Sequence, residues 1–190
     1  MNIKKAPEGA GKRPDKVSNK NRYRKPEAVK RLEKIYNEWY FTVKDNGKHS
    51  SFPIDSRVTK RFRDDDANSL TQCIKSWFEC NGGQMSRINT TGVFDTRLGR
   101  YRYSGASKGV ADLVGVYGGK LVAIEIKFGH DRQSEDQKRY QVEVEAAGGT
   151  YYIARDLTSF MEWFEKTFGY VNTCVSDRPL RQTLQSLSYE

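Results

Sequence analysis

The residues best suited to chemistry lie between positions 111 and 127, where the sequence reads ADLVGVYGGKLVAIEIK. Two apolar runs flank Tyr-Gly-Gly-Lys at positions 117–120, and this pattern predicts a β-hairpin. Side chains alternate along a strand, so Glu125 and Lys127 are expected on one face, two residues apart. Asp112 opens the partner strand. The hairpin is therefore expected to gather two carboxylates and one ammonium at a single point.

Such a group suits the chemistry of phosphate esters. Two carboxylates can hold Mg²⁺, and a lysine beside them can orient a water and stabilise charge on a phosphate oxygen. The alternative is a surface hairpin whose Glu125 and Lys127 face solvent. Leu121, Ala123 and Ile124 argue against it, because they predict a strand that is buried on both faces. A charged pair buried there needs partners or a metal.

The hairpin is followed by a polar loop and a helix start. Ser134 and Gln137 fit the capping box S-x-x-Q, which by itself explains both residues. Asp131 and Glu135 are interpreted as charges that favour a helix N-terminus rather than as metal ligands.

This arrangement resembles the PD-(D/E)XK nuclease superfamily, and more narrowly the VRR-NUC branch of phage and repair nucleases. The resemblance covers about positions 67 to 168 and rests on Gly109–Leu113, Ile124–Lys127, Ser134–Gln137 and the strand Gly149–Ala154. The sequence departs from the family twice: Ala111 stands where a proline is usual, and Asn68 stands about where an early-helix glutamate is expected. Either a nearby aspartate among positions 64–66 substitutes, or the site binds its metal with fewer carboxylates.

The resemblance implies an α/β fold, a restriction-endonuclease-like core with a central mixed sheet flanked by helices. It also implies a metal-dependent endonuclease acting on DNA, with branched DNA as a substrate in phage or bacterial replication, recombination and repair. Asp112 and Glu125 would hold Mg²⁺ or Mn²⁺, with the Ile126 carbonyl as a further ligand. Lys127 would position the nucleophile. Gln137 would lie near the water or the substrate, and a purely capping role is the alternative.

The charge of the chain fits a nucleic-acid partner. The formal net charge is +9, which favours binding to polyanions by counterion release, although a solvated basic surface would show the same balance. Positions 87–92 read RINTTG and resemble the R-x-N-x-x-G of VRR-NUC proteins. The candidate phosphate-contacting residues are Arg87, Asn89, Arg97, Arg100, Arg102, Lys108 and Arg132.

The sequence divides into four parts. Residues 1–25 form a basic arm that is expected to be disordered or partner-bound, and residues 26–63 an amphipathic helix and a linker. Residues 64–169 are the expected nuclease domain, and 170–190 a polar tail. The aromatic stripe of the first helix, from Pro26 to about Lys44, has two alternative packing partners. It docks on the core, or on a second copy in a homodimer anchored by Trp39 and Tyr40.

Several classes are excluded or disfavoured. Cys73, Cys80 and Cys174 have no CxxC spacing and cannot supply the four thiolates of a zinc or iron–sulfur site. Free thiols suit the cytoplasm of a bacterial or phage-infected cell, and no apolar run is long enough to cross a membrane. The alternative function is a nucleic-acid-binding or virion-associated protein on a nuclease fold with weak or lost catalysis. A third interpretation is a structural protein with an incidental basic tail.

Overall fold

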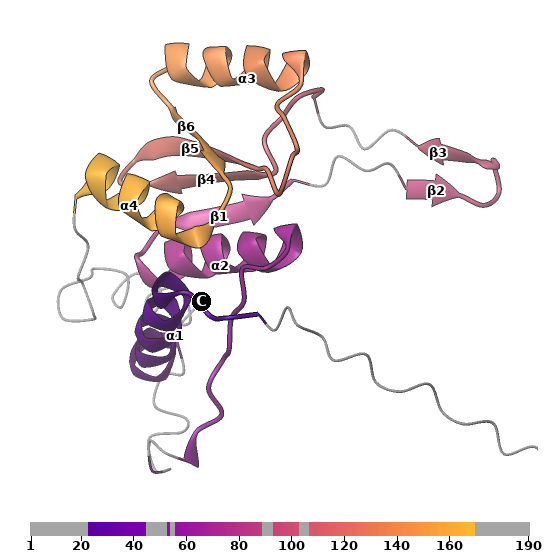
Figure 1. Ribbon diagram of the computed structural model, residues 1–190. Coiled ribbons are helices and arrows are strands. Elements are labelled where there is room, and N and C mark those ends of the chain that lie inside the picture. Colours follow the sequence, from indigo (N-terminus) through magenta and orange to yellow (C-terminus); the bar gives the residue numbers. More distant parts are fainter. Residues whose placement is uncertain (1–22, 45–52, 54–55, 89–92, 103–106, 170–190) are drawn as a thin grey trace, which may run out of the picture.

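The computed structural model describes residues 23–44, 53, 56–88, 93–102 and 107–169, and its elements are labelled in Figure 1. The helices are α1 (Glu27–Trp39), which continues into a π-helical turn (Tyr40–Lys44), α2 (Ala67–Cys80), α3 (Glu135–Ala146) and α4 (Leu157–Phe168). The strands are β1 (Gln84–Arg87), β2 (Val93–Asp95), β3 (Arg100–Arg102), β4 (Leu113–Tyr117), β5 (Lys120–Ile126) and β6 (Thr150–Ala154).

The central sheet has four strands in the order β1-β4-β5-β6. β1 runs antiparallel to β4 and β4 antiparallel to β5, whereas β5 runs parallel to β6. The turn between β4 and β5 contains Gly118 and Gly119, both with positive φ, as a tight connection requires. The predicted hairpin and the α/β class with a mixed sheet are therefore confirmed.

Helices cover both faces of this sheet (Figure 1). Ile124 and its β5 neighbours Val122 and Ile126 belong to the main core beneath α2 and α4, with α1 packed outside them. Ala123 belongs to a smaller core on the other face, where Val144 of α3 covers the sheet. Because side chains alternate along a strand, Glu125 projects to the α3 face.

Side chains cap the starts of α2, α3 and α4, and the cap at Ser134 is the one that the sequence predicted. The Asp66 side chain accepts hydrogen bonds from the backbone N–H groups of Asn68 and Ser69 at the start of α2. Asp156 does the same for Ser159 in α4, and Ser134 with Gln137 forms a complete capping box at α3. Pro26 is the residue that precedes α1 rather than its first residue. Each cap supplies an acceptor for N–H groups that have no partner within the helix.

One expectation about burial was wrong. Leu121 is 39% exposed, so β5 is not buried on both faces along its whole length.

The apolar stripe of α1 packs within the same chain. Ala28, Val29, Leu32 and Tyr36 lie in the main core, with Trp39 and Tyr40 partly buried against it. Of the two packing partners that the sequence allowed, the core and a second copy, the stripe contacts the core of its own chain. The proposed homodimer is not tested by it. The expected end of the helix at positions 45–47, most of the basic arm and the C-terminal tail lie outside the described residues.

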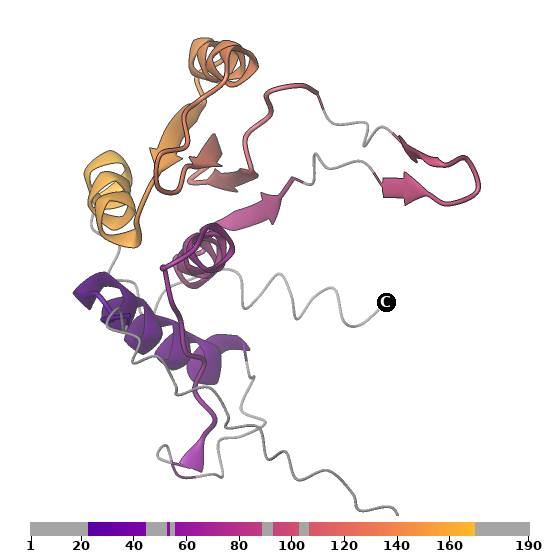
Figure 2. The same ribbon diagram turned by 45° about the vertical axis from the view of Figure 1, so that its right-hand side comes forward.

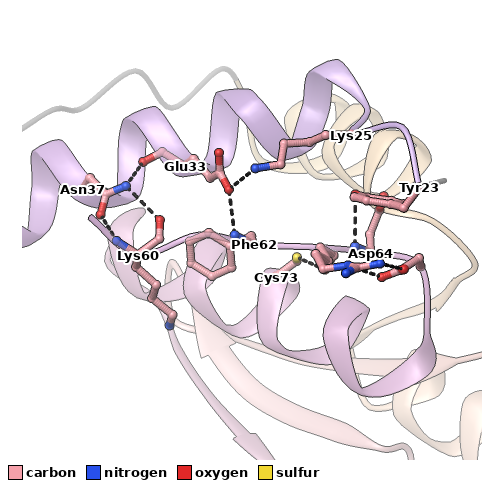
Figure 3. Close-up of polar contacts among 10 residues, drawn as sticks. Tyr23, Lys25, Glu33, Asn37, Lys60, Phe62, Asp64 and Cys73 are labelled. Carbon is pink, nitrogen blue, oxygen red and sulfur yellow. Dashed lines mark hydrogen bonds and ion pairs between the residues drawn. The ribbon is translucent and has the colours of Figure 1, made fainter. Parts of the chain in front are cut away.

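Polar contacts fix α1 and the residues before it to the segment that leads into α2 (Figure 3). The Asn37 side chain bonds both the N–H and the carbonyl of Lys60 (2.8 and 3.0 Å), and Glu33 accepts from the Phe62 N–H (2.7 Å). The Tyr23 hydroxyl donates to Asp64 Oδ1 at 2.7 Å. The last residues before α1 are thus anchored beside the N-terminus of α2.

Among the described residues, the remaining strands, β2 and β3, pair only with each other in a second sheet. Among the residues that the structure describes, no helix combines the length and apolar character that a membrane span requires.

Candidate functional site

The β4–β5 register brings the two candidate carboxylates together. Leu113 pairs with Ile124, so in the same antiparallel register Asp112 lies opposite Glu125. Asp112 Oδ2 accepts a hydrogen bond from the Ile126 N–H at 2.9 Å, and the Asp112 carbonyl accepts one from the Ile88 N–H at 2.8 Å. Asp112 is therefore fixed from both sides, by β5 and by the residue that follows β1.

The carboxylate of Glu125 is buried, with the residue only 1% exposed. Its Oε1 lies 3.1 Å from Lys127 Nζ and also accepts a hydrogen bond from Gln137 Nε2. Its Oε2 is buried too, and it has no hydrogen-bond partner among the described residues. An unpartnered, buried carboxylate oxygen is costly, and most such atoms in folded proteins have a partner or an ion.

Burial and neighbouring charges determine the pKa shifts of Glu125 and Lys127. Burial raises the pKa of Glu125 to about 7, and the nearby charge of Asp112 adds to this effect, while Lys127 opposes it. For Lys127, burial lowers the pKa, but its contacts with Glu125 and Asp131 outweigh this and the net shift is upward. Lys127 therefore remains a cation, whereas the proton on Glu125 is held weakly enough to leave near neutral pH.

Gln137 makes contacts of two kinds. Its Oε1 accepts from the Ser134 N–H at 2.9 Å and completes the capping box, while its Nε2 donates to Glu125 Oε1. The sequence left open whether Gln137 only caps the helix or also reaches the site. Within this structure it does both, and it ties the first turn of α3 to β5.

Three further residues around the site were not assigned there by sequence reasoning. Asp131 Oδ2 lies 3.3 Å from Lys127 Nζ and serves as its second anion rather than as a helix-end charge. Tyr151 on β6 is buried; burial raises its pKa to about 12, and the charges of Glu125 and Asp112 act in the same direction. Gly109 has a φ of +78°, and a Cβ there would lie 2.2 Å from the Asp136 carbonyl oxygen. The signal for Gly109 was its place at the start of Gly109–Leu113, a stretch on which the family resemblance rests.

Among the described residues, no third carboxylate joins Asp112 and Glu125. Within the described ranges, no group of three or more His, Cys, Asp or Glu side chains is placed to hold a metal. The aspartates at positions 64–66 have other partners: Asp64 accepts from Tyr23 (Figure 3), Asp65 pairs with Arg63, and Asp66 caps α2. The described residues therefore offer two carboxylates at this point, Asp112 and Glu125.

The donors present nevertheless fit a hard divalent cation. Mg²⁺ is commonly bound through one or two carboxylates, with waters and substrate oxygens completing the shell. Glu125 Oε2 is free to accept such an ion and Asp112 lies opposite it. The N–H and carbonyl of a strand residue face the same neighbour, so the Ile126 carbonyl lies on the side of β5 that faces Asp112.

The candidate phosphate-contacting residues are spread around this point. Arg87 ends β1, and Lys108 precedes Gly109; both side chains are exposed. Arg132 is exposed in the loop between β5 and α3, beside the exposed His130. Asn89 lies outside the described residues. Exposure leaves Arg87, Lys108 and Arg132 accessible to a polyanion.

Comparison with known proteins gave no match, either to a protein-family model or to a curated protein.

Proposed function

We propose that this chain is a metal-dependent nuclease that hydrolyses DNA phosphodiesters on a PD-(D/E)XK core of the VRR-NUC type. The observation that carries the proposal is the buried Glu125 carboxylate. One oxygen is held by Lys127 and Gln137, and the other has no partner within the described structure, opposite Asp112. A structural ion pair would need only the first of these oxygens.

Asp112 and Glu125 are the residues that would hold the metal, Mg²⁺ or Mn²⁺, with the Ile126 carbonyl as a further donor. When bound, such an ion supplies Lewis acidity towards a phosphate oxygen and an activated water. The backbone fixes this donor in advance, because Asp112 is hydrogen-bonded to Ile126 of β5 and to Ile88, the residue that follows β1.

Lys127 is the cation of the proposed site. It is buried, its pKa is raised, and Asp131 is its second anionic partner beside Glu125. A fixed ammonium stabilises negative charge that develops on a phosphate oxygen and orients the attacking water. Gln137 positions Glu125 through its amide, so that the free oxygen keeps its orientation.

A second candidate function is a nucleic-acid-binding or virion-associated protein that has lost catalysis on the same fold. The observation that favours it is the two-carboxylate site, because Asp64, Asp65 and Asp66 are all engaged elsewhere. Cleavage assays separate the two functions, since both include DNA binding.

The substrate proposed from the resemblance is branched or double-stranded DNA in a bacterial or phage-infected cell. Paired incision would need two sites, hence a homodimer. The intramolecular packing of α1 leaves that dimer to be formed by another surface.

The test is incubation of the purified full chain with linear duplex, single-stranded and four-way-junction DNA, each with Mg²⁺, Mn²⁺ or a chelator. We expect cleavage of DNA only with metal, and none with Asp112→Asn, which keeps the side-chain size. Binding without cleavage under every condition would favour the second candidate. Equal cleavage by wild type and Asp112→Asn would contradict the proposed site.

A further inference from the structure

The β2–β3 hairpin stands apart from the rest of the fold. Its strands pair Phe94 with Tyr101 and Asp95 with Arg100, and the turn between them spans residues 96–99. It does not join the central sheet, and both Figure 1 and Figure 2 show it projecting away from that sheet. A two-stranded hairpin by itself is only marginally stable in water, so a surface that packs on it would stabilise it.

The root of the hairpin, meaning the described segments just before and after it, lies at the candidate site. Ile88 follows β1 on the way to the hairpin, and residues 107–112 lead back from the hairpin to β4. The Ile88 N–H donates to the Asp112 carbonyl at 2.8 Å, so the outgoing and returning segments meet at Asp112 itself. The described segments that lead to and from the hairpin therefore meet at a proposed metal ligand.

The surface of the hairpin is basic. Residues 93–102 contain three arginines and one aspartate. The Arg97 and Arg100 side chains are exposed, and Leu98 at the tip is 48% exposed. Arg87 and Lys108 flank the root and are exposed as well. Arginine suits phosphate groups because its guanidinium can donate two parallel hydrogen bonds.

We propose that this hairpin lies in a groove of duplex DNA, with Arg97 and Arg100 contacting the phosphates that border the groove. The major groove is about 12 Å wide and admits a two-stranded β-ribbon. Leu98 would contact base edges, where an apolar tip can meet a thymine methyl group. This inference rests on the proposed function and specifies its substrate: duplex DNA must lie beside the strand that is cut.

The inference is tested by binding in the presence of a chelator, so that cleavage does not interfere. The probes are fluorescein-labelled DNA of about 30 base pairs and the corresponding single strand, each titrated with full-length protein over a range of salt concentrations. The variant is the double substitution Arg97→Ser and Arg100→Ser. Each phosphate that is no longer neutralised changes the slope of log K against log salt by about 0.9, so we expect a slope change of ~1.8 and at least tenfold weaker duplex binding at about 0.1 M salt.

The matched control is Lys30→Ser with Lys166→Ser. Both lysines are exposed, on α1 and α4, and the pair removes the same net charge away from the hairpin. We expect this control to retain most of the duplex affinity. Single-strand binding by the hairpin variant should fall much less than its duplex binding. An unchanged thermal midpoint would show that neither variant disturbs the core.

Three results would overturn the inference: duplex binding by the hairpin variant equal to wild type, an equal loss in the control pair, or an equal loss for single strands. These failures leave the proposed function standing, since Asp112→Asn tests the metal site without touching the hairpin. Conversely, a wild-type protein that binds the duplex through Arg97 and Arg100 but never cuts it would uphold the hairpin and reject the nuclease.

Discussion

The side-chain amide of Gln137 donates a hydrogen bond to Glu125 Oε1, so the first turn of α3 is tied directly to the buried carboxylate of β5. The same side chain accepts from Ser134 and caps the helix. One residue thus fixes both the start of α3 and the candidate metal ligand Glu125. The two contacts use opposite ends of the amide, and substitution can separate them.

Gln137→Glu should keep the cap and lose the contact with Glu125. A glutamate at this position of a capping box accepts the same backbone hydrogen bond, but it has no donor for Glu125 and adds a like charge. We expect thermal stability close to wild type, weaker Mg²⁺ binding by calorimetry, and slower cleavage. Gln137→Ala should lose stability too, by about 1 kcal/mol for the cap. Wild-type metal affinity in Gln137→Glu would limit the residue to capping.

Lys127→Ala should retain the metal and lose the rate. The ammonium is not a metal ligand, so calorimetry should show Mg²⁺ binding with at most a modest change. Removal of a single group that stabilises developing charge typically lowers the rate by about 10²–10³. The measurement is single-turnover cleavage of a duplex at saturating Mg²⁺. Cleavage at the wild-type rate would remove Lys127 from the proposed chemistry.

Glu125 should make the stability of the metal-free protein fall as the pH rises. Its pKa is raised from 4.5 to about 7 in the folded chain. Between these two pH values the folded state therefore binds a proton on Glu125 that the unfolded state has lost. The stabilisation is fully present below about pH 4.5 and is lost as the pH rises through about 7, with an upper limit of ~3 kcal/mol.

The comparison with Glu125→Gln isolates that contribution from those of other titrating groups. With a chelator present, the thermal midpoint of wild type should fall relative to that of the variant between pH 4.5 and pH 7. Addition of Mg²⁺ at pH 8 should raise the midpoint of wild type and leave that of the variant nearly unchanged. A pH-independent difference between the two proteins would mean that Glu125 does not titrate there.

The sequence predicts the hairpin and its charged pair because both depend on local periodicity. Alternation decides that Glu125 and Lys127 share a face, and the two glycines after Tyr117 decide where β4 turns into β5. Helix starts at Asp66, Ser134 and Asp156 are equally local, since each is set by one side chain and the backbone two or three residues later.

What the sequence could not predict depends on how α3 docks on the sheet. The second contact of Gln137 depends on where the first turn of that helix lies over β5, and the pairing of Asp131 with Lys127 depends on the path of the loop that leads into it. The destination of the α1 stripe was undecided for a similar reason, because an amphipathic pattern specifies a buried face without specifying its partner.

Deletion of residues 1–22 should weaken DNA binding without unfolding the core. This segment carries seven basic and two acidic residues, and the deletion leaves Tyr23 in place to donate to Asp64. A protein that neutralises fewer phosphates shows a shallower dependence of log K on log salt, by about 0.9 for each phosphate. The thermal midpoint should stay near that of the full chain, and an unchanged salt slope would contradict a binding role for the arm.

Gly109→Ala should disturb the site through the backbone, and Gly118→Ala provides the matched control. Both glycines have positive φ, +78° and +56°, so both substitutions carry the strain of that conformation, about 1–2 kcal/mol. Only at Gly109 would the new Cβ also lie 2.2 Å from a backbone atom, the Asp136 carbonyl oxygen, whereas at Gly118 no atom lies within 4 Å. The loop carrying Asp112 must then move away from α3. We therefore expect Gly109→Ala to lose Mg²⁺ binding and cleavage as well as stability, and Gly118→Ala to lose stability alone. Equal effects of the two substitutions on metal affinity would show that the packing of this loop on α3 does not position Asp112.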